Sequence, residues 1–249
     1  SSGLPEGLIK TTPNYALSTQ LNNTHYVANL YFPILGSNLS NYLFKSMPYN
    51  FDQFDWTKDI LRLPTTPTAM TAFNGRIYVF DENNTYRIEP NNLYIEDTFE
   101  GSGCIGKDSL IVTEYGMFYC DKNNVYMHNG NNPVTIADAI LKDSDAKFKF
   151  ATVGPPTGDH SEFYSVGWQD LAHNKPSAYG QNDPSVYKPK MTFDSKRKSV
   201  LISFQTQQDF LGDVYFLYSY NIPRQRWDIY LANGAEGEWD ANTIWYKPI

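Results

Sequence analysis

The feature that most constrains the fold of this chain is an internal repeat with a period of 40 residues. Residues 74–87 and 115–127 each read as strand, turn and strand, with a glycine, a short β-forming run, Asp-x-Asn-Asn, a β-branched residue and a tyrosine. The aspartates are Asp81 and Asp121, and the two copies align with one gap between the glycine and the aspartate. A period of about 40 residues is typical of propeller blades, each of which is a four-stranded sheet.

The residue types of the repeat explain why it should form hairpins. Aspartate and asparagine favour tight turns because their side chains bond their own backbone and tolerate positive φ. The β-branched and aromatic residues on either side then pair across the hairpin. One such unit cannot bury its apolar face alone, so neighbouring units must stack against it. We therefore predict an all-β, β-propeller-like fold, built of blades of about 40 residues.

A third repeat unit is predicted near the C-terminus. Strand-forming runs occupy 199–204, 214–220 and 227–230, and a polar turn at 221–226 separates the last two. Trp227, the first residue of the final run, is expected to pack between blades.

The rest of the chain suggests two domains and one long insertion. Residues 1–63 form an N-terminal strand-containing segment, which is either part of the ring or a docking region, and 64–249 form the propeller-like domain. One short helix is predicted from Thr135 to Lys142. Residues 152–190 are rich in proline and glycine, which break regular structure, and are predicted to be an insertion that contacts a partner. The chain begins with Ser1, so a processed product and a segment of a longer protein are both open.

The composition favours β structure and argues against two classes of protein, nucleic-acid binders and proteins that span a membrane. Aromatic residues make up 16% of the chain, and tyrosine and phenylalanine suit strands. The formal net charge of −7 argues against a dedicated nucleic-acid binder, because an acidic surface repels phosphate. The basic run 196–198 is predicted to be a solvated hairpin tip. No apolar run approaches the roughly 20 residues that span a bilayer, so no membrane span is expected.

No residue pattern predicts catalysis, a metal or a cofactor. Cys104 and Cys120 lack the spacing of a zinc site or a disulfide framework and are expected to be buried thiols. The pair His160 and Glu162 has no partner motif, and a solvated loop is the expected context. The Asp-x-Asn-Asn turns offer oxygen ligands for calcium but lack the spacing of a calcium loop, so hairpin turns are favoured.

Two kinds of side chain remain as candidates for function. Carboxylates that a propeller glycosidase would use include Asp52, Asp55, Asp97, Glu100 and Asp170, although the aspartate-box pattern of sialidases is absent. Five aromatic residues of the 152–190 insertion form the candidate interface, because aromatic side chains bury a large area at low entropy cost. They are Phe163, Tyr164, Trp168, Tyr179 and Tyr187.

One passage of the chain contains Gly103-Cys104, the run 115–121 with its glycine and aromatic strand, and Val125-Tyr126 with Gly130. With this passage, residues 60–145 resemble the nozzle, tubular and packaged-DNA-stabilising tail proteins of short-tailed bacteriophages, and 190–231 resemble them more loosely. A run with isoleucine at both ends, 136–140, follows where the family has a short helix.

The resemblance implies a structural role in the virion tail rather than an enzyme. Such proteins form rings that line or close the tail channel, retain packaged DNA and open at ejection. The expected partners are further copies of the chain and other tail or portal-adaptor proteins, with non-specific passage of viral DNA. An acidic surface suits a channel through which DNA must slide. The family carries no catalytic residues, so none are assigned.

Two other functions stay open from the residues alone. A carbohydrate-binding or adhesion module of propeller type would use the aromatic residues of the insertion. A propeller glycoside hydrolase would use a pair of the carboxylates named above.

Overall fold

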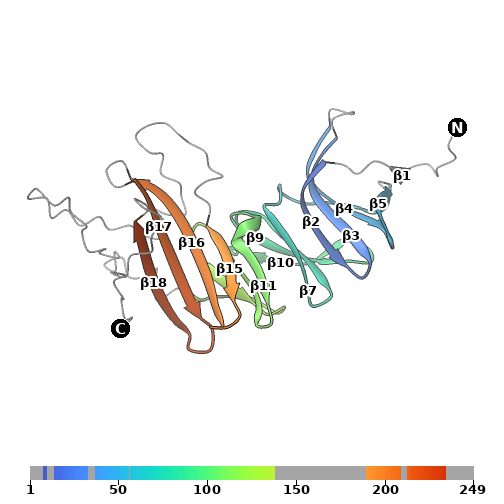
Figure 1. Ribbon diagram of the computed structural model, residues 1–249. Helices are drawn as coiled ribbons and strands as arrows, with labels where there is room; N and C mark the ends of the chain where they lie inside the picture. The colour runs from blue at the N-terminus through green and yellow to red at the C-terminus, as the bar shows by residue number, and fades with distance from the viewer. Residues whose placement is uncertain are drawn as a thin grey trace, which may run out of the picture. The chain divides into compact units, whose positions relative to one another are not determined.

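The computed structural model describes residues 8–9, 14–32, 37–55, 57–137, 189–208 and 212–233. The described part is all-β and contains four antiparallel sheets (Figure 1). The chain divides into two compact units, one of residues 1–117 with 128–133, the other of residues 118–127 with 134–249.

The first sheet has six strands, in the order β1-β5-β4-β3-β2, with β6 paired to β4. The strands are β1 (Leu8–Ile9), β2 (Asn14–Leu21), β3 (Thr24–Phe32), β4 (Ser37–Met47), β5 (Asn50–Asp55) and β6 (Ile60–Arg62).

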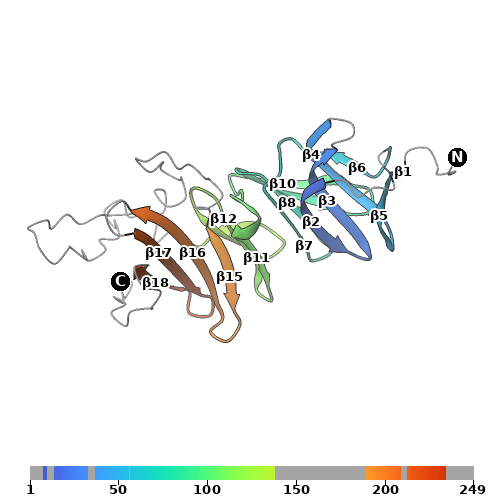
Figure 2. The same ribbon diagram turned by 45° about the horizontal axis from the view of Figure 1, so that its top comes forward.

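The next two sheets each have four strands and contain the two copies of the repeat. One is β7 (Ala69–Phe73), β8 (Arg76–Phe80), β9 (Asn84–Glu89) and β10 (Tyr94–Glu100). The other is β11 (Leu110–Thr113), β12 (Gly116–Cys120), β13 (Val125–His128) and β14 (Pro133–Thr135), and Figure 2 shows β12 alongside β11. In both sheets the strands pair in chain order. The bounds of β8 and β12 differ by 40 residues, so the structure confirms that the repeat consists of hairpins in successive four-stranded sheets.

The fourth sheet pairs its strands in chain order as well. It contains β15 (Lys190–Asp194), β16 (Ser199–Gln208), β17 (Gly212–Asn221) and β18 (Arg226–Asn233). The three strands predicted near the C-terminus are confirmed as parts of β16, β17 and β18. The basic run 196–198 lies in the β15–β16 turn, as predicted, where the Asp194 carboxylate accepts from two backbone amides of the turn.

Trp227 lies at the start of β18 and is buried. Its indole N–H donates to the carbonyl of Ile136 at 2.9 Å, and its ring contacts Tyr218 and Tyr220 of the neighbouring strand β17. Ile136 follows β14, so the indole joins the fourth sheet to the segment after the third. The ring therefore packs on its own sheet, and packing between blades stays a prediction.

The main core of the first unit lies where the six-stranded sheet meets the sheet of β7–β10. Successive side chains of a strand point to opposite faces of its sheet, so Ile77 and Val79 of β8 and Tyr86 and Ile88 of β9 lie on one face. The buried side chains of this core are Leu17, Tyr26, Ala28, Leu43, Leu63, Met70, Ile77, Val79, Tyr86, Ile88 and Leu93. A second cluster of Val27, Leu30, Phe44 and Phe54 forms within the six-stranded sheet. The segment before residue 64 thus supplies the apolar cover that one face of the first repeat sheet needs.

The helix predicted from Thr135 to Lys142 is wrong over its described part. Thr135 is the last residue of β14, and 136–137 are not helical. The amide of Ile136 donates to the carbonyl of Val125 at 2.9 Å, which continues the pairing with β13 in place of a helical bond. Two β-branched residues, Val134 and Thr135, favour this extended backbone. Residues 138–142 lie outside the described residues.

The insertion predicted at 152–190 lies outside the described residues except at its end, where Lys190 begins β15. The only helical turn in the described ranges is the 3-10 helix η1 (Lys107–Ser109). No helix in those ranges has the length and apolar character needed to cross a bilayer.

A substitution of Gly103 tests how tightly the linker after β10 packs on the β8–β9 turn. A Cβ at this position would lie 2.3 Å from the carbonyl carbon of Glu82, a backbone atom that cannot rotate away. We expect Gly103→Ala to lower the free energy of unfolding by about 2–3 kcal/mol through overpacking, measured by urea denaturation.

Gly101→Ala is the matched control. Gly101 has φ +71° and open space around it, so a side chain there is disfavoured only by the left-handed backbone conformation. Its expected cost is about 1 kcal/mol. Equal losses for the two variants would contradict the close packing at Gly103.

Candidate functional site

The first polar cluster of interest is the turn between β8 and β9, which the side chain of Asp81 organises. Its Oδ1 accepts from the backbone amides of Asn83 at 2.7 Å and Asn84 at 2.6 Å. Its Oδ2 accepts from the hydroxyls of Thr65 at 2.5 Å and Tyr86 at 2.8 Å. One buried carboxylate therefore holds the turn, the following strand and the linker before β7 together.

The turn between β12 and β13 repeats this arrangement. Oδ1 of Asp121 accepts from the amides of Asn123 at 2.7 Å and Asn124 at 2.6 Å, and Oδ2 accepts from the hydroxyl of Tyr126 at 2.9 Å. The bonds match those of the first copy atom for atom, apart from the threonine. The spacing of aspartate, asparagine and tyrosine in the repeat is thus the sequence signature of one hydrogen-bonded turn.

The environments of the two carboxyl groups shift their pKa values in opposite directions. Burial alone raises the pKa of Asp81, but the hydrogen bonds from Thr65, Asn83, Tyr86 and Asn84 outweigh it, so the pKa lies below its ordinary value. At Asp121 burial dominates the bonds from its own turn, and the pKa is raised.

These turns use their oxygens for structure. Both oxygens of each carboxylate accept hydrogen bonds from the turn or from tyrosine, as expected for hairpin turns. The described ranges contain no group of three or more histidine, cysteine, aspartate or glutamate side chains placed to hold a metal ion.

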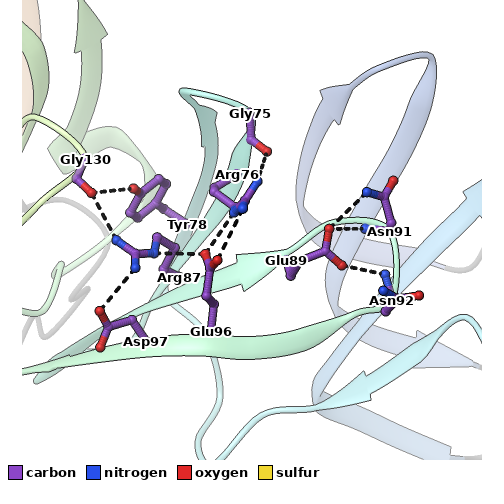
Figure 3. A network of polar contacts seen from close by, with 10 residues as sticks. All are labelled: Gly75, Arg76, Tyr78, Arg87, Glu89, Asn91, Asn92, Glu96, Asp97 and Gly130. Carbon is purple, nitrogen blue, oxygen red and sulfur yellow. Dashed lines mark hydrogen bonds and ion pairs between the residues drawn. The ribbon is translucent and has the colours of Figure 1, made fainter.

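The second polar cluster, which we call the Gly130 joint, lies where the β13–β14 turn meets the sheet of β7–β10 (Figure 3). The Gly130 carbonyl accepts from Arg87 Nη1 at 3.1 Å and from the Tyr78 hydroxyl at 3.4 Å. Asn74 Nδ2 donates to the neighbouring Asn129 carbonyl at 3.3 Å. Side chains of one repeat thus bind the backbone of a turn from the next.

Ion pairs hold the arginine of the joint in place. Arg87 pairs with Glu96 at 3.0 Å and with Asp97 at 3.3 Å, and Arg76 pairs with the same oxygen of Glu96 at 2.8 Å. Figure 3 shows Glu96 between the two guanidinium groups. The hydrogen bond from Arg76 contributes most to holding the pKa of Glu96 below its ordinary value. Arg87 also lies over the Phe99 ring, 5.7 Å from its centroid.

His128 contacts two residues of the Gly130 joint, Gly130 and Tyr78. It is fully buried, with Tyr78 and Phe99 packed edge-on at centroid distances of 5.1 and 4.8 Å. Its Nδ1 accepts from the amide of Gly130 at 3.0 Å, so the ring proton belongs on Nε2, which has no hydrogen-bond partner within the described ranges. Burial lowers the pKa of His128 to about 4, and the nearby Arg87 charge acts in the same direction.

The structure describes only some of the candidates taken from the sequence. Asp52 in β5 and Glu100 in β10 are exposed. Asp97 pairs with Arg87, and Asp55 accepts from Thr57 and pairs with Lys58 at 3.4 Å. Cys104 and Cys120 are both buried, as expected, although Cys104 lies in the linker between β10 and β11. The pair His160 and Glu162, Asp170 and the five candidate interface residues lie outside the described residues. Those five are Phe163, Tyr164, Trp168, Tyr179 and Tyr187.

Sequence reasoning missed the Gly130 joint. Arg76 and Arg87 lie on β8 and β9, and Glu96 and Asp97 are consecutive on β10, where the register shifts between Ile95 and Asp97. Pairing them requires the strand register, in which Arg87 lies opposite both Asp97 and Tyr78.

No protein-family model matches this chain, and no curated protein matches it either.

The opposite pKa directions of the two repeat carboxyls predict different costs for the same substitution. At neutral pH, Asp81→Asn removes an ionised form that the fold favours, and we expect a loss of about 2 kcal/mol in the free energy of unfolding. Asp121→Asn removes a charge that burial disfavours, so its cost should stay below about 1 kcal/mol. Urea denaturation of both variants measures the difference, and an equal or reversed order would contradict these environments.

The lowered pKa of His128 predicts that the free energy of unfolding falls on acidification. Its pKa in the folded protein is about 4, below the ordinary value of 6.5, so the unfolded chain binds more protons between these two values. The contribution of the neutral ring is complete above about pH 6.5 and is lost as the pH falls to 4, on the order of 3 kcal/mol.

The measurement is the free energy of unfolding across this pH range for the natural chain and for His128→Gln. Glutamine keeps a hydrogen-bond acceptor but does not titrate, so the variant should lose most of the slope. Identical slopes for the two proteins would contradict the assignment.

Proposed function

We propose that this chain is a structural component of a bacteriophage tail, in the nozzle or DNA-retention part of the portal–tail channel. It acts through ring assembly and DNA gating, without catalysis. The observation that carries the proposal is the matched pair of aspartate turns, 40 residues apart in successive four-stranded sheets. Modular sheets of this kind bury their faces only against neighbours, which favours an assembled structure.

The propeller architecture belongs to the same proposal. Three successive four-stranded sheets with strands in chain order are the units from which propeller blades are built. The Gly130 joint and the indole of Trp227 each connect consecutive parts of the chain in the way that stacked blades require. The resemblance of residues 60–145 to the tail proteins of short-tailed phages directs the proposal to that setting.

The use of the polar side chains supports a role without catalysis. Several structural bonds occupy each of four charged side chains, Asp81, Asp121, Glu96 and Arg87. The net charge of −7 also suits a channel that lets DNA slide.

The proposal is tested by the assembly state of the purified chain, alone and mixed with portal-adaptor and tail proteins of short-tailed phages. Light scattering should report a closed oligomer or incorporation into one, and particle imaging should show a ring. Trp168→Ala and Tyr179→Ala, in the candidate interface, should weaken the assembly by about tenfold or more. Tyr94→Ala in β10, an exposed aromatic residue outside the insertion, is the matched control and should leave assembly unchanged.

A chain that stays monomeric with every tail protein would overturn the tail proposal. Tight glycan binding by such a monomer, lost in Trp168→Ala, would instead establish the carbohydrate-binding alternative. Turnover of a glycoside that disappears when one carboxylate is replaced would establish the hydrolase.

A further inference from the structure

The turn at Asn129-Gly130 contains a reactive arrangement that the structural role of the joint does not use. An Asn-Gly peptide can cyclise when the glycine nitrogen attacks the asparagine side-chain carbon, because glycine has no Cβ to obstruct the approach. The rate depends on removing the amide proton and on polarising the side-chain carbonyl. Neighbouring groups supply both here.

His128 is placed to take the proton. The amide N–H of Gly130 points at His128 Nδ1, with 3.0 Å between the nitrogens, within the reach of a general base. The buried imidazole is neutral at neutral pH, so its Nδ1 carries the lone pair that accepts from this N–H. The carbonyl of the same glycine, in the next peptide unit, is held by Arg87 and Tyr78.

The asparagine side chain is placed to accept the attack. Its Oδ1 accepts from the backbone amide of Asn131 at 3.1 Å. This donor withdraws electron density from Cγ and stabilises negative charge on the oxygen as a tetrahedral intermediate forms. Asn129 is also exposed, so water can reach the site.

We propose that Asn129 is a site of self-catalysed deamidation, in which the Gly130 nitrogen attacks Asn129 Cγ and His128 acts as the general base. The Gly130 amide proton passes to His128 Nδ1 as the Cγ–N bond forms. The Cγ–Nδ2 bond then breaks, and Nδ2 leaves as ammonia with the proton returned by the imidazolium. The product is a succinimide ring that includes the Gly130 nitrogen.

Water completes the reaction. It adds to either carbonyl carbon of the ring and breaks that carbon's bond to nitrogen, which leaves aspartate or isoaspartate at position 129. Overall, one asparagine and one water yield one acid and one ammonia, with no oxidant or reductant. Isoaspartate adds a carbon to the backbone before Gly130, which displaces the carbonyl that Arg87 and Tyr78 hold. The modification therefore loosens the Gly130 joint, whatever the wider function of the chain.

The chain contains its own comparison site at Asn74-Gly75. This pair lies at the β7–β8 turn, has the same two residues and is preceded by Phe73, which carries no base. Asn74 also uses its Nδ2 to bind the carbonyl of Asn129. If the Asn-Gly pair by itself set the rate, the two sites would react alike.

The experiment follows both sites in the full chain at neutral pH, folded and in urea, by peptide mapping with mass spectrometry and isoaspartate detection. In the folded protein, Asn129 should convert about tenfold or more faster than Asn74. In urea, which removes the alignment with His128, the two rates should become equal. Equal rates in the folded chain, or faster conversion of Asn129 in urea than in the folded state, would overturn the proposal.

His128→Gln provides the second test. Glutamine retains an acceptor for the Gly130 amide but is not a base, so conversion at Asn129 should slow about tenfold while Asn74 is unchanged. An unchanged or increased rate at Asn129 in a folded variant would show that the turn protects the asparagine. Chain scission between 129 and 130 would also overturn the assignment, because the backbone carbonyl would then be the group attacked. If the variant does not fold, the comparison of the folded and urea-treated natural chain still decides.

Discussion

A buried carboxylate that accepts two backbone amides of a hairpin turn is the interaction on which the repeat depends. A tight turn leaves amide groups without strand partners, and burying them unbonded costs about 1–3 kcal/mol each. Asp81 and Asp121 satisfy these amides and also bind a tyrosine from the next strand. The turn thereby sets the register of the hairpin, and with it which side chains face the core.

The linkers between sheets are anchored to the same turn. The amide of Cys104 donates to the carbonyl of Asp81 at 2.8 Å, and Gly103 packs directly on the backbone of Glu82. Thr65, from the linker before β7, binds the carboxylate itself. One turn therefore fixes the hairpin and both flanking linkers. This explains how a glycine, a cysteine and an aspartate far apart in the chain belong to one structural unit.

The Gly130 joint shows a second use of polar groups, which is to connect one repeat to the next. Its arginine, tyrosine and asparagine all act on backbone carbonyls of the β13–β14 turn. Exposed ion pairs contribute little by themselves, often less than about 1 kcal/mol, so Glu96 and Asp97 act mainly by orienting Arg87. The same turn places the amide of Gly130 against His128 Nδ1, so the residues of the joint also create the chemical environment of Asn129.

The sequence by itself determined the class of fold, the hairpins of the repeat, the strands near the C-terminus and the buried state of both cysteines. These features depend on local patterns, since turn chemistry and alternation act over a few residues. Only the tertiary structure decided the extended path after Thr135, the partners of Arg87 and the opposite shifts of two identical turn aspartates. Each of these depends on residues distant in the chain, such as Val125, Asp97 and Thr65, whose positions follow from strand register and sheet packing.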